Sequence, residues 1–555
     1  MNKAKSQLIL LADCICYIIA LAAGTYLRFG ADNAAGIFFY YSGGFYGLVL
    51  ILSTISYIAL YIYFHGKGEY KLGSDLIDQF EQVFRNHCLV FVALIVILFA
   101  FQAGELLSRR LIFYTFIISF CLDLVVREMI RHILQKRYEN NVKTLTIAGR
   151  IVKVLKDDES LGIDDNVMHV FAIGCKGIPA EYGGFESFMH NLTGNRQDEN
   201  ILYHVARIAE DDLRFEFNNA AVFDVHVPSI GAAGAVYFDL AALNKSIAYC
   251  RKNKVKNPVF FIMACRIGPF IAAYKRKIKA MGGTLLVNPD GHEWKRQKWN
   301  RFIRAYWKVS ERLMVKSADR LICDSRNIEK YIREEYKAFS PVTSYISYGA
   351  KPVEADDERS ARVDEEFFNW IRYNRVVPGG YYLIVGRFVP ENNFETMIRE
   401  FMHSKTKRDL VVITTENDKL LGELEKKLRF SSDKRVKFTG TVYDTGLLTE
   451  IRKNAYGYIH GHSVGGTNPS LLESLASTNV NLLFDVGFNS EVGGDAALYW
   501  KLDAGSLSKL IEKTDALSDD ERAQMGEKAK QRISDNYLWE KIVKDYESVF
   551  KGGAV

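Results

Sequence analysis

The residues of this chain best suited to chemistry form a glycine-rich bend, Val464-Gly-Gly-Thr-Asn-Pro-Ser470. Its two glycines let the backbone approach a ligand closely, Asn468 is a good helix N-cap, and Pro469 suits the first helical position. Exposed N–H groups at a helix start bind anions. The bend therefore predicts a phosphate site, and an ordinary capped helix is the alternative.

Two further places carry residues suited to ligand binding. Arg387 comes shortly after a predicted strand, Tyr381 to Val385, where its guanidinium would project into a cleft and hold phosphate through two N–H groups. A surface salt bridge is the alternative for a lone arginine.

Gly183 and Gly184 lie between a predicted strand and a helix that Glu186 opens. A loop without side chains admits a donor or an acceptor there, which is compatible with a plain strand-to-helix turn.

An α/β fold is expected to position these residues. From Val167 onward, short apolar runs alternate with longer segments of helical periodicity, which predicts parallel sheets covered by helices. Residues 350–378 are charged, lack strong periodicity and separate two such halves. Two doubly wound halves create a cleft, and ligands bind at the carboxyl ends of the strands. The predicted strands are Val167 to Ile173, Ile201 to Ala206, Ala221 to Val227, Val259 to Ala264, Thr284 to Val287, Tyr381 to Val385, Leu410 to Thr414, Val436 to Thr439, Ala455 to His460 and Asn481 to Asp485.

Composition excludes several classes of protein. Of the 555 residues, 48% are hydrophobic and 25% are charged, which excludes a disordered or fibrous chain. The formal net charge of +6 is too small to indicate nucleic-acid binding. The cysteines include no Cys-x-x-Cys pair and no zinc spacing, so neither a disulfide framework nor a structural metal is indicated. Because no Asp-x-Asp triplet occurs, we expect a site without a metal.

The first 140 residues differ from the rest. They hold four apolar segments, Leu8 to Leu27, Phe38 to Phe64, Cys88 to Ala103 and Leu111 to Val126. About 20 helical residues cross a ~30 Å hydrocarbon layer, so we expect an α-helical four-span membrane domain rather than a cleaved signal peptide. Lys and Arg counts near the spans predict that both termini and the soluble part are cytoplasmic. Asp13 and Asp123 would lie inside spans, where snorkelling, interhelical hydrogen bonding and transport chemistry are the open roles.

A basic and aromatic segment begins shortly after Asp290. Residues 294–308 contain six Lys or Arg, three Trp and no acid. Such amphipathic segments bind anionic membrane interfaces, and a solvated helix with buried aromatic residues is equally compatible. The residues expected to face a membrane are Trp294, Lys295, Arg296, Lys298, Trp299 and Arg301.

Four motifs follow one another between residues 167 and 550. They are Ile173-Gly-Cys-Lys-Gly-Ile-Pro-Ala-Glu-Tyr-Gly-Gly-Phe-Glu186, Asn288-Pro-Asp-Gly-His-Glu-Trp-Lys-Arg296, Val385-Gly-Arg-Phe-Val-Pro-Glu-Asn-Asn393 and Gly461-His-Ser-Val-Gly-Gly-Thr-Asn-Pro-Ser-Leu-Leu-Glu473. Together they resemble the motifs of family-4 GT-B glycosyltransferases of the rhamnosyltransferase-like branch. The resemblance implies a GT-B fold, in which two Rossmann-like doubly wound domains face a cleft.

The resemblance also implies roles for single residues. Asp290 stands near where related enzymes place a His or Asp facing the reacting sugar, so it would accept the acceptor proton or stabilise charge at the anomeric carbon. A turn-forming Asp is the alternative. Many relatives have a glutamate in place of Gly465 and a lysine near Asn392 or Asn393, which implies a different donor geometry here. The implied donor-binding residues are Arg387, Asn392, Asn393, Gly465, Gly466, Thr467, Asn468, Ser470 and Glu473, the last directed toward a ribose hydroxyl.

Two short motifs mark the N-terminal part, Tyr26-Leu-Arg-Phe-Gly30 and Ser108-Arg-Arg-Leu-Ile-Phe113. With the layout of four segments, they resemble the membrane domain of bacterial polyprenyl-phosphate hexose-1-phosphate transferases. The expected organisation is a four-helix membrane domain (1–140), a linker or remnant strand (141–166), an acceptor-side GT-B domain (167–350), a linker (351–378), a nucleotide-sugar-side GT-B domain (379–535) and a helix returning to the first GT-B domain (536–555).

These resemblances imply a glycosyltransferase on the bacterial inner membrane. It would move rhamnose from dTDP-rhamnose, with retention of configuration and without a cofactor, to a polyprenyl-diphosphate-linked saccharide such as one on undecaprenyl diphosphate. The product would belong to a surface polysaccharide. A nucleotide-sugar epimerase of the same fold, a non-catalytic membrane scaffold and a sugar-1-phosphate transferase are the alternatives. Self-association through the membrane domain stays open.

Overall fold

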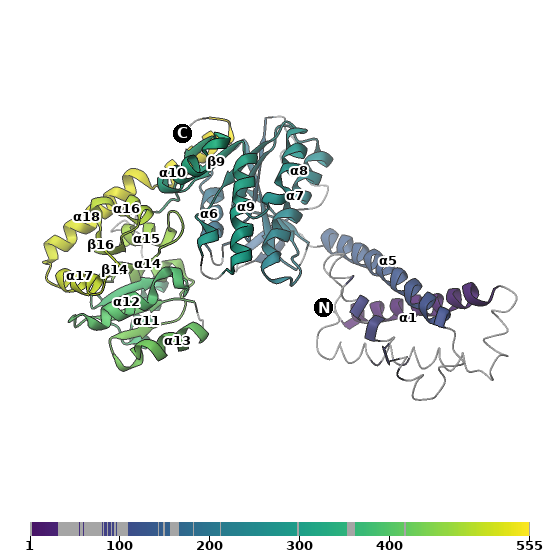
Figure 1. Cartoon of the computed structure of the whole chain (residues 1–555), viewed down its shortest axis with the longest axis horizontal. Coiled ribbons are helices and arrows are strands. Elements are labelled where there is room, and N and C mark those ends of the chain that lie inside the picture. The colour runs from purple at the N-terminus through teal and green to yellow at the C-terminus, as the bar shows by residue number, and fades with distance from the viewer. Residues whose placement is uncertain are drawn as a thin grey trace.

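The computed structural model describes residues 3–30, 109–141, 144–147, 150–155, 166–180, 183–210, 212–296, 299–351, 361–415 and 418–553, with isolated residues between 55 and 96. Two long helices, α1 (Lys3–Phe29) and α5 (Arg109–Asn141), lie side by side and precede two α/β domains (Figure 1). We name these the N-terminal domain, built on strands β1 to β10, and the C-terminal domain, built on β11 to β16.

The prediction of four membrane spans is wrong. Among the described residues, one helix is long and apolar enough to cross a membrane, over Leu11–Phe29 of α1. Helix α5 contains the fourth predicted segment but carries Arg109, Asp123 and Arg127 in and beside it, so its apolar run is interrupted by charge. Most residues of the second and third predicted segments lie outside the described residues.

A buried ion pair joins α1 and α5. Arg127 on α5 donates from Nε to Oδ1 of Asp13 on α1 over 3.0 Å, and from Nη2 to Oδ2. Both side chains are almost fully buried. Asp123, one turn earlier on α5, places Oδ2 3.3 Å from Nε2 of His87. Asp13 therefore bonds between helices, one of the roles expected for an acid in an apolar segment.

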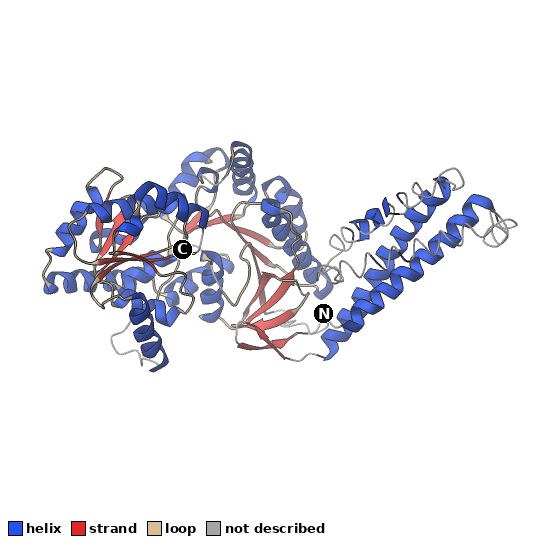
Figure 2. Ribbon diagram, turned by 90° about the horizontal axis from the view of Figure 1, so that it is seen from below, coloured by secondary structure: helices blue, strands red, loops and turns tan. Residues whose placement is uncertain are grey.

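The N-terminal sheet has ten strands in the order β1-β2-β5-β6-β4-β3-β7-β8-β9-β10. The seven neighbouring strands β6, β4, β3, β7, β8, β9 and β10 pair in parallel. At the β6 edge, β5, β2 and β1 continue the sheet in antiparallel pairs. The parallel strands are nearly all apolar because helices cover both faces (Figure 2). The strands are β1 Thr144–Ile147, β2 Arg150–Val154, β3 Met168–Ile173, β4 Ile201–Ile208, β5 Arg214–Phe217, β6 Ala220–Val225, β7 Val259–Met263, β8 Thr284–Asn288, β9 Arg320–Cys323 and β10 Thr343–Tyr345.

Five α-helices connect these strands, and short 3-10 turns lie beside them. They are α6 Gly184–Gly194, α7 Gly234–Asn253, α8 Gly268–Lys279, α9 Arg301–Ser317 and α10 Arg326–Glu335, with turns η3 Gly231–Ala233, η4 Glu293–Lys295 and η5 Lys337–Phe339.

The C-terminal sheet has six parallel strands in the order β13-β12-β11-β14-β15-β16. This is a doubly wound order that reverses between β11 and β14. The strands are β11 Tyr381–Val385, β12 Asp409–Ile413, β13 Val436–Phe438, β14 Gly457–His460, β15 Asn481–Phe484 and β16 Leu498–Trp500. The helices are α11 Ala361–Asn374, α12 Phe394–His403, α13 Asp418–Leu428, α14 Thr445–Lys453, α15 Pro469–Ser477, α16 Gly487–Gly493, α17 Ser506–Asp515, α18 Asp519–Asn536 and α19 Trp539–Phe550.

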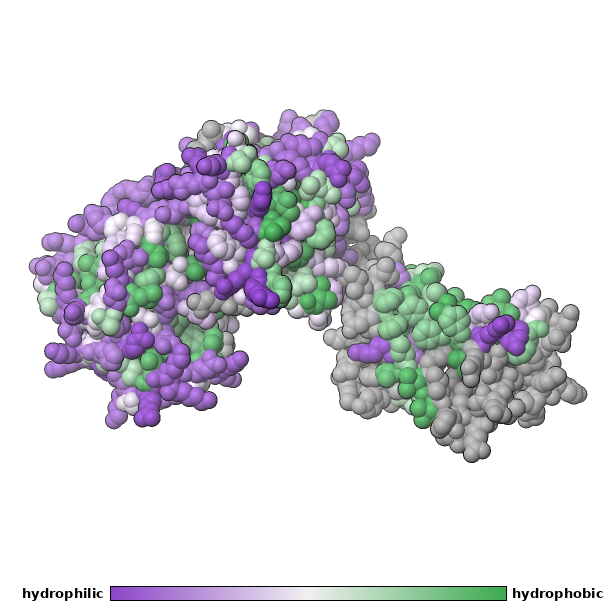
Figure 3. Space-filling model, in the orientation of Figure 1, coloured by the Kyte–Doolittle hydropathy of each residue, from purple (hydrophilic) through white to green (hydrophobic). Residues whose placement is uncertain are grey.

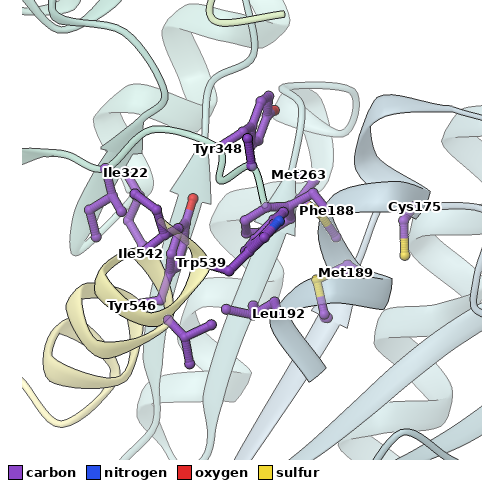
Figure 4. Packing of buried hydrophobic residues seen from close by; sticks show 14 of the residues in the cluster. Cys175, Phe188, Met189, Leu192, Met263, Ile322, Tyr348, Trp539, Ile542 and Tyr546 are labelled. Atoms are coloured by element: carbon purple, nitrogen blue, oxygen red, sulfur yellow. The ribbon is translucent and has the colours of Figure 1, made fainter. Parts of the chain in front are cut away.

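The last helix, α19, packs on the N-terminal domain. Its Trp539 and Tyr546 rings lie 6.1 and 5.0 Å from the ring of Phe188 on α6, and these residues share one buried cluster with Ile542 (Figure 4). The chain leaves the N-terminal domain after Ala350 and returns to it after Tyr537, and the N–H of Ala350 donates to the carbonyl of Tyr537 over 2.7 Å. Two crossings of the chain therefore connect the domains at one side.

Candidate active site

The candidate site begins where the strand order of the C-terminal sheet reverses. β11 lies between β12 and β14, and such a reversal opens a crevice at the carboxyl ends of the two inner strands. Arg387 follows β11, and His462 follows β14. The Arg387 side chain is exposed and makes no hydrogen bond or ion pair with the part of the chain that the structure describes. Its guanidinium is thus available to a ligand.

Two asparagines tie the loops after β11 and β14 together. Asn392 donates from Nδ2 to the carbonyl of Arg387 over 2.8 Å, and its Oδ1 lies 2.8 Å from Nδ1 of His462. Asn393 donates from Nδ2 to the carbonyl of Gly461 over 2.8 Å. The sequence suggested both as donor ligands, and the structure places their side chains on neighbouring loop atoms, where they position Arg387 and His462.

The glycine-rich bend leaves a run of main-chain donors unused. The N–H groups of residues 464–468 donate no hydrogen bond within the described ranges. Gly465 has a φ of 145°, a conformation that favours glycine. Gly465, Gly466 and Thr467 are buried, and buried N–H groups require an acceptor. A turn with successive free N–H groups forms an anion-binding concavity.

The bend packs directly on the N-terminal domain. A Cβ on Gly466 would lie 2.0 Å from Oδ1 of Asp324, and one on Gly291 would lie 2.3 Å from Cα of Gly465. Thr467 donates from Oγ1 to the carbonyl of Asp324 over 2.6 Å. The two domains are therefore closed on one another here, and neither glycine has room for a side chain.

The helix after the bend is anchored by a buried arginine. Asn468 caps α15 by accepting from the N–H of Ser470 over 2.9 Å. Arg452 on α14 donates to Oγ of Ser470 over 3.2 Å and pairs with Oε2 of Glu473 over 2.7 Å. The Glu473 side chain is 49% exposed, so it keeps access to solvent beside the crevice while Arg452 holds its orientation.

Asp290 lies across the cleft from the bend. It follows β8 with a φ of 57°, and its N–H donates to Oδ1 of Asn288 over 2.7 Å. Burial raises the pKa of the Asp290 carboxyl, and the nearby guanidinium of Arg296 opposes this rise. A half-buried carboxyl with a raised pKa suits proton transfer.

Asp324 was missed by the sequence analysis. It follows β9, the neighbour of β8, and is 2% exposed. Burial raises the pKa of its carboxyl to about 7, and the charge of Asp290 adds to the rise. The available signal was a polar residue directly after an apolar strand, Arg320–Cys323, but that short strand was not predicted.

His462 also lies in this region, and the sequence did not predict it as a site residue. Burial lowers the pKa of His462 well below its ordinary value, and the charges of His460, Arg296 and Arg387 lower it further. Arg296, which the sequence predicts to face a membrane, is therefore near enough for its charge to act on His462. The adjacent loops are far apart in the chain, so sequence spacing gave no sign of this.

The glycine pair of the first half forms a self-contained turn. Gly183, with a φ of 131°, precedes α6, and space beside Gly184 is open. Glu186 accepts from the N–H of Lys176 over 2.7 Å, so its carboxylate closes the loop after β3.

The basic and aromatic segment divides between buried and exposed side chains. Trp294 is half-buried beneath Nζ of Lys308, at 4.7 Å from its ring centre. Trp299 donates from Nε1 to Glu293 over 2.9 Å and lies 6.2 Å from the buried Trp307 ring. Lys295 and Arg301 are exposed, and Lys298 lies outside the described residues.

No group of three or more His, Cys, Asp or Glu side chains suited to a metal ion occurs among the residues that the structure describes.

Two family models match parts of the chain. A domain of unknown function, DUF1972, matches residues 167–351, and a CoA-binding domain matches residues 65–161. The first covers most of the N-terminal domain, and the second includes α5, β1 and β2. Comparison with curated protein sequences gives no match.

Several solved structures share the two-domain fold. Sucrose-phosphate synthase from Thermosynechococcus elongatus has a TM-score of 0.55 and 15% identity, over 69% of this chain and 98% of that one. An α,α-trehalose 6-phosphate synthase from Burkholderia multivorans has a TM-score of 0.51 and 10% identity, over 70% and 96%. HepE of Anabaena, in complex with UDP and glucose, has a TM-score of 0.51 and 12% identity, over 69% and 99%. The α/β GT-B glycosyltransferase fold expected from the motifs is therefore confirmed for the two domains that follow the helices.

Proposed function

We propose that this protein is a glycosyltransferase that uses a nucleotide sugar. The observation that carries the proposal is that the loops after β11 and β14, which carry Arg387 and the free N–H groups of residues 464–468, are joined through Asn392 and His462. Transfer from a nucleotide sugar releases a diphosphate, and fixed donors with positive charge stabilise that leaving group. A GT-B fold supports the same reading, since HepE, one of its neighbours, is seen with UDP and glucose.

Asp290 is proposed to face the reacting sugar. It stands opposite the bend, with a half-buried carboxyl of raised pKa, and would accept the proton of the acceptor hydroxyl or stabilise charge at the anomeric carbon. Retention of configuration follows from the family resemblance. Turnover without a metal is expected because Arg387 and the bend supply the donors. Activity that EDTA abolishes and magnesium or manganese restores would contradict that expectation.

The donor and acceptor come from the resemblance of the motifs. We propose rhamnose from dTDP-rhamnose as the donor, and a polyprenyl-diphosphate-linked saccharide as the acceptor, in the assembly of a bacterial surface polysaccharide. Reaction at the cytoplasmic face of the inner membrane would give access to nucleotide sugars.

Contact with a membrane is supported by two features of the surface. Helix α1 has an apolar stretch of spanning length and exposes Leu11, Ile15 and Ile18. On α9, Phe302 and Val309 are 71% and 54% exposed, and Figure 3 shows apolar side chains over this helix. The exposed Lys295 and Arg301 lie in the same segment, which suits an interface that carries anionic lipid.

Transfer assays test the proposal. Membranes that carry the protein are incubated with dTDP-rhamnose and other nucleotide sugars, with and without a lipid-diphosphate sugar. We expect sugar transfer to the lipid and release of a nucleoside diphosphate, both lost in Arg387→Ala and Glu473→Ala. Absence of transfer with every nucleotide sugar would contradict a transferase, acceptor-independent turnover would indicate an epimerase, and release of a nucleoside monophosphate would indicate a sugar-1-phosphate transferase.

A further inference from the structure

The two loops of the proposed diphosphate site supply a single arginine from the C-terminal domain. The loops at residues 386–393 and 461–468 contain one basic side chain other than histidine, Arg387. Asn392 and Asn393 are neutral, and their side chains already bond to the loops. A bound diphosphate carries at least two negative charges, so one guanidinium leaves part of that charge unpaired in a buried place.

The opposite wall of the cleft brings a second guanidinium to this place. Gly291 touches Gly465 so closely that a Cβ on Gly291 would lie 2.8 Å from the nitrogen of Gly466. Arg296 lies five residues further on, at the end of η4, and its carbonyl accepts from Nε of Arg304 over 3.3 Å. Its side chain is 13% exposed. The loop that carries Arg296 therefore forms the wall facing the bend.

Arg296 and Arg387 converge on His462 from different domains. Burial lowers the pKa of His462, and the charges of both arginines lower it further. His462 follows β14 and contacts the bend, since a Cβ on Gly465 would lie 2.8 Å from its Nε2. An anion beside His462 would therefore lie within the field of one guanidinium from each domain.

Arg266, a half-buried arginine of the N-terminal domain, already has partners within the described chain. Arg266 donates from Nη1 to the carbonyl of Gly174 over 2.9 Å and pairs with Asp239. Arg296 pairs through Nε with Oε2 of Glu293 over 2.5 Å, and its two terminal nitrogens make no hydrogen bond with the described part of the chain. Those terminal nitrogens have the fork geometry that binds phosphate oxygens.

We infer that Arg296 is the second cation of the diphosphate site, so that a nucleoside diphosphate is held between Arg296 of the N-terminal domain and Arg387 of the C-terminal domain. The inference rests on the proposed function and deepens it. It assigns the residue to the ligand rather than to a membrane surface, and it makes tight diphosphate binding dependent on closure of the two domains.

Binding measurements on the full chain in detergent test this. The probes are UDP and dTDP, by calorimetry, and uridine and thymidine, by ligand-observed NMR. We expect Arg296→Gln to weaken diphosphate binding about ten- to a hundredfold, since a hydrogen-bonded charged partner is lost, and to leave nucleoside binding within about twofold. Arg296→Lys should retain part of the affinity, because it keeps the charge without the fork.

Lys295→Ala and Arg301→Ala are the matched controls, because both residues are exposed members of the same basic segment. Unchanged diphosphate binding in these two variants would support a specific role for Arg296. Loss of nucleoside and diphosphate binding together in Arg296→Gln would indicate a folding role and overturn the inference. If the wild-type chain binds UDP or dTDP and Arg296→Gln binds it with the same affinity, the inference is overturned and the proposed function stands. A wild-type chain that binds neither would overturn both.

Discussion

Two arginines of the C-terminal domain, Arg452 and Arg387, differ in burial and in bonding partners, and therefore in what each guanidinium can do. Arg452 is 4% exposed and holds Ser470 and Glu473 at the start of α15. Arg387 is exposed and has no partner in the described chain. A paired, buried guanidinium stabilises the fold, because removing one partner of such a pair leaves an uncompensated charge. An unpaired guanidinium at a strand end is instead available for a ligand.

Replacement of Arg387 by alanine should therefore separate binding from stability. We expect Arg387→Ala to weaken UDP or dTDP binding about ten- to a hundredfold, the value of a charged hydrogen-bonded contact, with little change in the melting temperature. Calorimetry and thermal unfolding measure the two effects. Lys434→Ala, at an exposed position of the same domain, is the control, and an equal loss of affinity in that variant would count against a site at Arg387.

Asp324 predicts how stability depends on pH. Its pKa is raised to about 7 from 3.8 by burial, so between these values the folded chain keeps a proton that the unfolded chain has released. The stabilisation that this proton gives to the folded chain is complete below the unfolded pKa of 3.8. It is lost as the pH rises through the folded pKa of about 7, by up to ~1.4 kcal/mol per pH unit. Asp324→Asn removes this dependence. Denaturant unfolding of both proteins across the range should show a difference that changes with pH and levels off above the higher value; a constant difference would contradict the assignment.

At the scale of elements, one helix of the C-terminal domain caps a helix of the N-terminal domain. Glu491 on α16 accepts from Oγ of Ser325 over 2.7 Å, from the N–H of Arg326 over 2.9 Å and from Nδ2 of Asn327 over 2.9 Å. A carboxylate at a helix N-terminus is favoured by the free N–H groups and by the helix dipole. The start of α10 is thus completed only when the domains meet.

Removal of this cap should loosen the closed arrangement. We expect Glu491→Ala to lower the free energy of unfolding by about 1–3 kcal/mol, because several hydrogen bonds to a charged group are lost, and to increase the radius of gyration in small-angle scattering. Glu527→Ala, a 77% exposed residue of α18, is the matched control. A cap variant with unchanged scattering and stability would show that closure does not depend on Glu491.

At the scale of the whole molecule, the N-terminal domain is completed by the last helix of the chain. Trp539 and Tyr546 of α19 fill a cluster with Phe188 and Tyr348, and a Cβ on Gly349 would lie 2.5 Å from the Trp539 ring. The two domains therefore share a hydrophobic core across the point where the chain crosses between them.

A substitution near the C-terminus should accordingly destabilise the distant first half. We expect Trp539→Ala to lower the free energy of unfolding by about 3–5 kcal/mol, as for other buried tryptophans. Hydrogen exchange should locate the loosened amides on α6 and β7 as well as on α19. Tyr373→Ala, at an 88% exposed aromatic residue, should change neither quantity, and loosening confined to α19 would contradict a shared core.

The sequence by itself determined the features that depend on neighbours along the chain. Apolar runs located β3, β11 and β15 to within a residue or two, because burial on both faces of a parallel sheet leaves a continuous apolar segment. Asn468 and Pro469 predicted where α15 begins, because capping acts over two or three residues. Short strands such as β9 and β10 were missed, since three or four residues carry too little pattern.

Only the tertiary structure decided which distant groups meet. Gly291 with Gly465, Asp324 with Gly466, and Arg296 with His462 each join segments from different domains. Charge and hydrogen-bonding capacity are visible in a sequence, but the partner that uses them depends on how the two sheets close. For the same reason, the apolar character of the first 140 residues did not reveal the ion pair of Asp13 with Arg127, which depends on two helices lying side by side.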